Sequence, residues 1–230
     1  MHRFINILSE ERASAYKLSD TETNKDVLNR YLFNIALGKS FYTLLDMFEI
    51  CLRNRINNIF MSDFGTNWII ENDFFDDQLK QEVAEIVKRL EISKKDVTNN
   101  RLVSELNLGF WTHLFNSKYR YIWQQNKRII RLLKGETFSI KEVSKELTII
   151  RKFRNRVFHF ETLFTHHPEY CHLLIIRYLT ALADNDDFMK IVSDMDEVKN
   201  FLGLSYNNLK ELDLIVNELI LVQGEIESYI

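Results

Sequence analysis

Three side chains on one short segment have the chemistry that RNA cleavage requires: Arg154, Asn155 and His159. RNA carries its own nucleophile, the 2′-hydroxyl, so a nuclease needs only a general acid or base and fixed positive charge on the phosphate. Histidine suits the first task because its unperturbed pKa is roughly 6.5. Arginine suits the second because its planar fork binds phosphate oxygens and stays protonated. The segment therefore predicts catalysis that needs no metal and no other cofactor.

The position of Arg154 in a predicted helix is unusual. The apolar stripe of that helix consists of Ile140, Val143, Leu147, Ile150 and Val157. Arg154 occupies the same stripe, where an arginine must be paired, line a cleft or extend to solvent. The alternative is structural: Arg154 pairs with a buried carboxylate such as Glu49, and His159 is an interior histidine.

The spacing of the motif also has a geometric consequence. Asn155 and His159 are four residues apart and share a stripe, and Arg156 lies three residues before His159. Arg154 and His159 are five apart, so roughly 500° of helical rotation leaves them about 140° apart. One straight helix does not aim both at one phosphate. Either the helix is distorted there, or a second copy of the chain completes the site.

The charges are unevenly distributed, although the formal net charge is only −3. Residues 118–156 hold twelve Lys or Arg and three Glu, whereas residues 160–230 hold four basic and thirteen acidic residues. This pattern predicts a local anion-binding surface on an acidic body. The predicted RNA contacts are Lys127, Arg128, Arg131, Lys134, Arg151 and Arg156. The alternative is that these charges belong to solvated helix faces.

Composition favours an all-α protein. Hydrophobic residues make up 46% of the chain, and a single Pro and six Gly leave little of the turn punctuation that many strands need. Cys51 and Cys171 lie in apolar stretches and are expected to be free thiols. No stretch is long and apolar enough to span a bilayer and no signal segment is evident, so we expect a cytoplasmic protein without membrane contact. His166 and His167 lack the convergent spacing of a metal site.

Helical periodicity predicts the order of elements and three parts of the chain. A Ser139-x-x-Glu142 capping box opens the helix that carries the motif. The predicted helices cover about 24–61, 76–90, 101–116, 119–134, 140–160, 169–183, 186–202 and 206–228. The predicted parts are an N-terminal helix and connection (1–23), a main helical domain (24–165) and a helical C-terminal extension on the same body (166–230).

Four blocks of the sequence resemble a known family. They are Tyr31-Leu32-Phe33-Asn34, Phe48-Glu49 with Leu52-Arg53-Asn54-Arg55, Leu102-Val103-Ser104-Glu105-Leu106-Asn107-Leu108-Gly109-Phe110-Trp111, and Arg154-Asn155-Arg156-Val157-Phe158-His159-Phe160-Glu161. The last block matches the R-N-x-x-x-H form of the HEPN ribonuclease motif. The order and spacing of the blocks, over about residues 28–165, resemble the Abi-like (abortive infection) family.

The resemblance implies a HEPN-type helical bundle, here with additional C-terminal helices, in an anti-phage or toxin protein. It implies an endoribonuclease that leaves 2′,3′-cyclic phosphates at a composite site in a homodimer, restrained by a small-RNA or protein antitoxin. On this match His159 is the general acid or base, Arg154 the phosphate clamp and Asn155 the residue that orients them. Phe160 departs from the commonest pattern, which has a second histidine there. Glu49 and Arg53 either form a structural ion pair or help to position the catalytic side chains.

Two other functions fit the same residues. The chain could be a non-catalytic RNA-binding module that holds a regulatory RNA on the basic surface. It could equally be a helical scaffold for protein interactions, in which Arg154 and His159 are structural. RNA turnover in the presence of EDTA separates the nuclease from both alternatives, and copurification of RNA separates the module from the scaffold.

Overall fold

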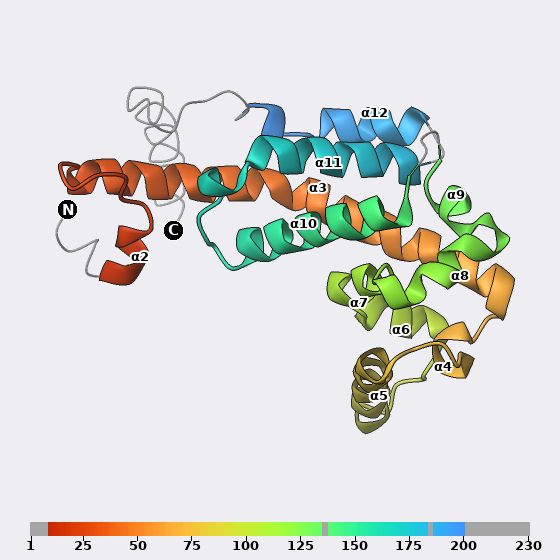
Figure 1. Ribbon diagram of the computed structural model, residues 1–230. Helices are drawn as coiled ribbons and strands as arrows, with labels where there is room; N and C mark the ends of the chain where they lie inside the picture. The colour runs from red at the N-terminus through yellow and green to blue at the C-terminus, as the bar shows by residue number, and fades with distance from the viewer. Residues whose placement is uncertain (1–8, 135–137, 184–185, 201–230) are drawn as a thin grey trace, which may run out of the picture. The chain divides into compact units, whose positions relative to one another are not determined.

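The structure is a computed structural model that describes residues 9–134, 138–183 and 186–200, and all regular structure in these ranges is helical (Figure 1). This confirms the predicted all-α fold. The elements are α2 (Glu10–Ser14), α3 (Asn24–Phe64), α4 (Trp68–Glu71), α5 (Asp77–Ile92), α6 (Asn99–Glu105), α7 (Leu108–His113), η1 (Ser117–Tyr119), α8 (Arg120–Gln124), η2 (Gln125–Lys127), α9 (Arg128–Leu132), α10 (Ile140–Phe158), η3 (Phe164–His166), α11 (Pro168–Leu182), α12 (Asp186–Asp194) and η4 (Val198–Asn200). None of the described helices is long and apolar enough to cross a membrane.

The chain divides into two compact units built from segments that are distant in the sequence. Of the described residues, the first unit takes 9–43, 153–172 and 195–200. The second takes 44–134, 138–152, 173–183 and 186–194. The long helices α3, α10 and α11 each contribute residues to both units. The three consecutive parts expected from the sequence stay a prediction.

The core of the first unit joins the segment around α2 to the start of α3. Ala13, Tyr16, Val27 and Phe164 form one buried cluster, and the rings of Tyr16 and Tyr31 meet edge to face at 5.3 Å. The buried Arg30 donates to the carbonyl oxygen of Tyr16 and to both carboxylate oxygens of Glu22. These contacts attach residues 9–23 firmly to α3.

In the same unit, α3, α10 and α11 meet around Phe41. The Phe41 ring lies 4.7 Å from that of Phe153 on α10 and 6.4 Å from that of His172 on α11. Gly38 lies one turn before Phe41, and α3 continues through it, although glycine often interrupts a helix. A Cβ there would stand 3.4 Å from the Leu163 side chain, so glycine permits the close approach of the segment that follows the motif.

In the second unit the same three helices meet around Tyr178. Its ring packs edge to face against Phe48 of α3, and its hydroxyl donates to the buried Glu146 of α10 at 2.8 Å. Arg177 completes the ion pair with Glu146 at 3.0 Å. The smaller helices α4 to α9 pack through aromatic rings, among them Phe60 against Trp68 and Trp123.

The strongly periodic helices are predicted well. α3 and α10 run over the expected residues, and the Ser139 hydroxyl accepts the Glu142 N–H at 3.1 Å, as a capping box requires. α5 buries the predicted stripe, Leu79, Val83, Ile86 and Leu90. Cys51 and Cys171 are free thiols, as expected. The helix predicted over 206–228 lies outside the described residues.

Two predicted helices are in fact broken, and the one predicted over 186–202 ends at Asp194, before a 3-10 turn at Val198–Asn200. The one over 101–116 divides into α6 and α7, because Leu106 is extended and the Asn107 side chain accepts the Phe110 N–H as a new N-cap. The one over 119–134 divides into η1, α8, η2 and α9, because Asn126 and Lys127 have positive φ angles of 49° and 50°. Apolar spacing cannot reveal such breaks, since the stripe continues across each of them.

Candidate functional site

The predicted motif lies at the C-terminal end of α10, in the first unit. His159 is the C-cap residue, and Phe160 after it has a φ of 55°. The N–H of Glu161 donates to the carbonyl of Arg156 at 2.9 Å, and the N–H of Phe160 donates to that of Val157 at 3.3 Å. This is a Schellman motif, in which glycine usually takes the left-handed position that Phe160 occupies here.

Side chains from far away in the sequence fix this helix end. Nη2 of Arg12 donates to the carbonyl oxygens of Phe160 at 2.9 Å and His159 at 3.3 Å. Its positive charge opposes the partial negative charge of the helix C-terminus. Asn34, which is buried, donates to the carbonyl of Glu161 at 3.0 Å and accepts the N–H of Leu163 at 2.7 Å. The backbone on both sides of Phe160 therefore has one well-defined course.

Arg154 is half-buried and held by aromatic rings. Its guanidinium carbon lies 4.3 Å from the centre of the Phe158 ring. That ring stacks in turn on Tyr42 of α3, with centroids 5.1 Å apart and planes at 17°. A cation over an aromatic face keeps its charge and loses rotational freedom. The stack thus presents Arg154 in a restricted orientation.

Asn155 and His159 are both exposed. The N–H of His159 donates to the carbonyl of Asn155 at 2.9 Å, so helical geometry continues through the motif. Of the two explanations for the angular offset between Arg154 and His159, a distorted helix is therefore not what the structure has. The offset of about 140° therefore stays, and completion of the site by a second copy stays a prediction.

A cavity with charges of both signs adjoins the end of the motif. It has a volume of about 290 Å³, and its lining includes Arg12, Arg156, Glu161 and the apolar surfaces of Ala15, Tyr16 and Phe160. Arg156 also forms an ion pair with Glu161 at 2.8 Å. Sequence reasoning predicted Arg156 but missed Arg12. No local signal could have found Arg12, because it reaches the motif only through the packing of residues 9–23 against α3.

The burial of Arg128 corrects its assignment as an RNA contact. Its side chain is only 3% exposed, and Nε donates to Asp63 at 2.6 Å while Nη1 donates to the carbonyl of Ile122 at 2.7 Å. Arg131 binds the same carboxylate at 2.8 Å. Burial raises the pKa of Asp63, but the hydrogen bonds from Arg131 and Arg128 outweigh it and hold that pKa below its usual value. Arg128 is a structural cation.

The other basic residues of this stretch are distributed differently from the prediction. Lys127 and Lys134 are exposed, but the break at Asn126 and Lys127 interrupts the single helix over 119–134 on which they were expected. Instead Arg131 and Lys134 line a cavity of about 310 Å³ with Arg55 and Asn58 of α3. Nε of Arg55 donates to the carbonyl of Arg131 at 3.3 Å.

The remaining predicted residues belong to the second unit. Arg151 lines a polar cavity with His113 there. Glu49 and Arg53 are half-buried on α3, and their role in supporting the catalytic residues stays a prediction.

Comparison with models of protein families, with curated proteins and with solved structures finds no match to this chain. Any function must therefore be argued from its own residues.

Proposed function

We propose that the protein is a metal-independent endoribonuclease whose catalytic residues are Arg154, Asn155 and His159. One observation carries the proposal: an exposed histidine stands at a helix end whose backbone is fixed by Arg12 and Asn34. His159 is the general acid or base toward the 2′-hydroxyl and the leaving 5′-oxygen. Its neighbour Phe160 lines a cavity with Arg12, Arg156 and Glu161, and the two arginines are the groups there that can attract a phosphate.

The fixed backbone matters because a general base acts efficiently only when it is held within hydrogen-bond reach of the proton it removes. His159 has an exposed side chain on an immobilised backbone, so its imidazole is accessible while its position is restricted. Arg154 has the restricted orientation that a phosphate clamp needs, since its guanidinium rests on Phe158.

The angular offset between Arg154 and His159 supports a homodimer in which Arg154 of one copy and His159 of the other act on one phosphate. This agrees with the composite site implied by the resemblance to Abi-like HEPN proteins. A role in anti-phage abortive infection or as a toxin, with an RNA or protein antitoxin and a cytoplasmic location, rests on that resemblance.

The decisive experiment measures cleavage of labelled RNA by pure protein in the presence of EDTA. We expect wild-type protein to leave 2′,3′-cyclic phosphate ends, and His159→Ala to lose at least about 100-fold in rate. Arg154→Lys should lose most of the activity as well, because an ammonium lacks the bidentate fork. His167→Ala is the matched control, since His167 is an exposed histidine of the same unit outside the motif.

Circular dichroism of each variant separates lost chemistry from lost folding. If His159→Ala and Arg154→Lys are folded and cut RNA as fast as wild type, the nuclease proposal is wrong. If no variant cuts RNA, wild type included, but all bind it, the chain is an RNA-binding module. That second function is favoured by the cavity that Arg55, Arg131 and Lys134 line.

A further inference from the structure

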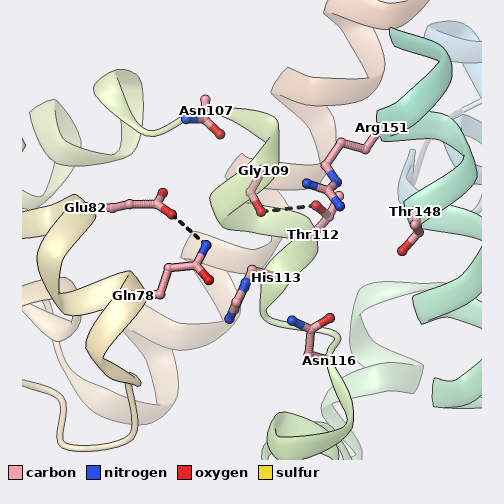
Figure 2. Close-up of a pocket in the computed structure, with 9 residues that line it drawn as sticks. All are labelled: Gln78, Glu82, Asn107, Gly109, Thr112, His113, Asn116, Thr148 and Arg151. Atoms are coloured by element: carbon pink, nitrogen blue, oxygen red, sulfur yellow. Dashed lines mark hydrogen bonds between the residues drawn. The ribbon is translucent and has the colours of Figure 1, made fainter. Parts of the chain in front are cut away.

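The second unit contains a polar cavity of about 300 Å³ that includes none of the proposed catalytic residues (Figure 2). Helices α5, α7 and α10 and the segment after α7 contribute to it. Its lining consists of Gln78, Glu82, Asn107, Gly109, Thr112, His113, Asn116, Thr148 and Arg151. Ligand pockets are mostly apolar with a few polar groups. This lining of amides, hydroxyls and charged groups instead suits a strongly polar ligand.

Arg151 supplies the positive charge of the cavity. Figure 2 shows its side chain reaching from α10 toward Thr112 of α7. Arg151 is half-buried, and its Nε atom is buried without a hydrogen-bond partner among the described residues. A buried donor of a charged group is costly to leave unsatisfied. Because the Nε atom has almost no accessible surface, an anion in the cavity would pair with the Nη end of this guanidinium, which Figure 2 shows within the cavity.

His113 is oriented by an acidic partner outside the cavity. Its Nε2 lies 2.9 Å from the carboxylate of Asp76, which also pairs with Lys118 and caps α5. Burial lowers the pKa of His113, Arg151 lowers it further, and Glu82 raises it. With Nε2–H donated to Asp76, the neutral ring has Nδ1 left as an acceptor.

The other lining groups are largely acceptors too. The hydroxyls of Thr112 and Thr148 donate to the backbone carbonyls of Gly109 and Ser144, so only their lone pairs are left for a ligand. Glu82 accepts from Gln78 at 3.2 Å and has further lone pairs. A ligand that fits must bring several O–H or N–H donors in addition to its anionic group.

Gly109 contributes no side chain to the part of the cavity that α7 lines. A Cβ at this position would stand 2.7 Å from Oδ1 of Asn107, closer than any real contact allows. That oxygen is needed where it is, because it caps α7 through the Phe110 N–H. Glycine therefore lets the capping amide and the open cavity coexist.

We propose that this cavity binds a small phosphorylated molecule rich in hydroxyl groups: a sugar phosphate, either free or as the sugar and phosphate of a nucleotide. Arg151 holds the phosphate. Glu82, His113 and the two threonines accept hydrogen bonds from the sugar hydroxyls, and the amides of Asn107 and Asn116 are additional donors and acceptors. This site contains none of the proposed catalytic residues, and of the residues predicted to contact RNA it contains Arg151 alone.

Calorimetric titration of the full chain with ribose 5-phosphate and with GMP tests the proposal, with ribose and inorganic phosphate as partial ligands. We expect saturable one-to-one binding with Kd at or below about 1 mM for at least one phosphorylated ligand, and binding at least about tenfold weaker for ribose. If GMP binds about tenfold more tightly than ribose 5-phosphate, the base also occupies the site and the ligand is a nucleotide. The reverse preference identifies a free sugar phosphate.

Three variants complete the test. Arg151→Met keeps the length of the side chain and should weaken binding at least about tenfold, whereas Lys145→Met, an exposed cation of α10 outside the lining, should bind as wild type does. Thr148→Met fills the cavity and should abolish binding even if Arg151→Met does not fold. No binding by either phosphorylated ligand, or wild-type binding by folded Arg151→Met or Thr148→Met, would overturn the proposal.

Discussion

The residue that best explains the candidate site is Asn34, although it carries no chemistry itself. Its amide makes two hydrogen bonds to the backbone of Glu161 and Leu163, two and four residues after His159. A third contact, at 3.2 Å, joins its Nδ2 to the hydroxyl of Tyr16. The exposed histidine thus depends on a buried amide more than a hundred positions earlier in the chain.

We predict that Asn34→Ala destabilises the protein by about 2–4 kcal/mol, because it leaves the buried N–H of Leu163 and the part-buried carbonyl of Glu161 without this partner. Asn34→Asp should cost less, since it keeps the acceptor for the Leu163 N–H. Urea unfolding measures both, and Asn54→Ala, an exposed asparagine of α3, is the control that should change stability little. Equal stability of Asn34→Ala and Asn54→Ala would contradict the role assigned to Asn34.

At the scale of elements, Asp63 joins the end of α3 to α9. Its carboxylate accepts from Arg128, which is buried, and from Arg131, which is 37% exposed. We predict that Asp63→Asn costs about 3–5 kcal/mol, because it leaves the Arg128 charge buried without a counter-charge. The double variant Asp63→Leu, Arg128→Met should recover most of this loss, since it removes both buried charges. Chemical unfolding of wild type, Asp63→Asn and the double variant measures their free energies of unfolding and tests both expectations.

The same pair gives a pH dependence with a defined sign. The pKa of Asp63 is lower in the folded protein than its ordinary value of 3.8. Its stabilising contribution is therefore fully present above that value and is lost as the pH falls through the still lower pKa of the folded state. We expect wild type to lose stability more steeply than Asp63→Asn below about pH 4. Parallel stability curves of the two proteins in this range would contradict the ion pair.

At the scale of the whole molecule, the first expectation is a homodimer at tens of micromolar, detectable by light scattering. If Arg154 and His159 act across the dimer, mixing the inactive Arg154→Ala and His159→Ala proteins should restore partial RNA cleavage. Each mixed dimer then contains one site with both residues intact. A protein that is only monomeric, or mixed dimers that form without any activity, would exclude the composite site.

The second expectation concerns how RNA reaches that site. Among the cations predicted to bind RNA between residues 127 and 134, Lys127 and Lys134 are exposed. Reversing both to Glu should weaken RNA binding and flatten its salt dependence by roughly 0.7 for each phosphate group that the variant no longer binds. The control reverses Lys94 and Lys95, which are exposed elsewhere in the second unit. An unchanged affinity and slope would mean that these lysines only keep the surface solvated.

The sequence alone determined the helical class, the extents of α3, α5 and α10, and the placement of a histidine and an asparagine beside the apolar stripe at the end of α10. These features depend on interactions within a few residues: apolar periodicity, a capping box, and the scarcity of glycine and proline. The candidate catalytic residues were likewise chosen from residue types and spacing within six positions.

Only the tertiary structure decided which charged residues are exposed and which hold the fold together. Arg128 and Arg131 look alike in the sequence, yet Arg128 is buried and Arg131 is partly exposed. Both bind Asp63, which lies 65 and 68 residues before them in the chain. Arg12 reaches the helix end from 147 residues away, and Arg151 faces a cavity whose other walls come from α5 and α7. Burial and ion pairing depend on which segments pack together, and local spacing does not encode that.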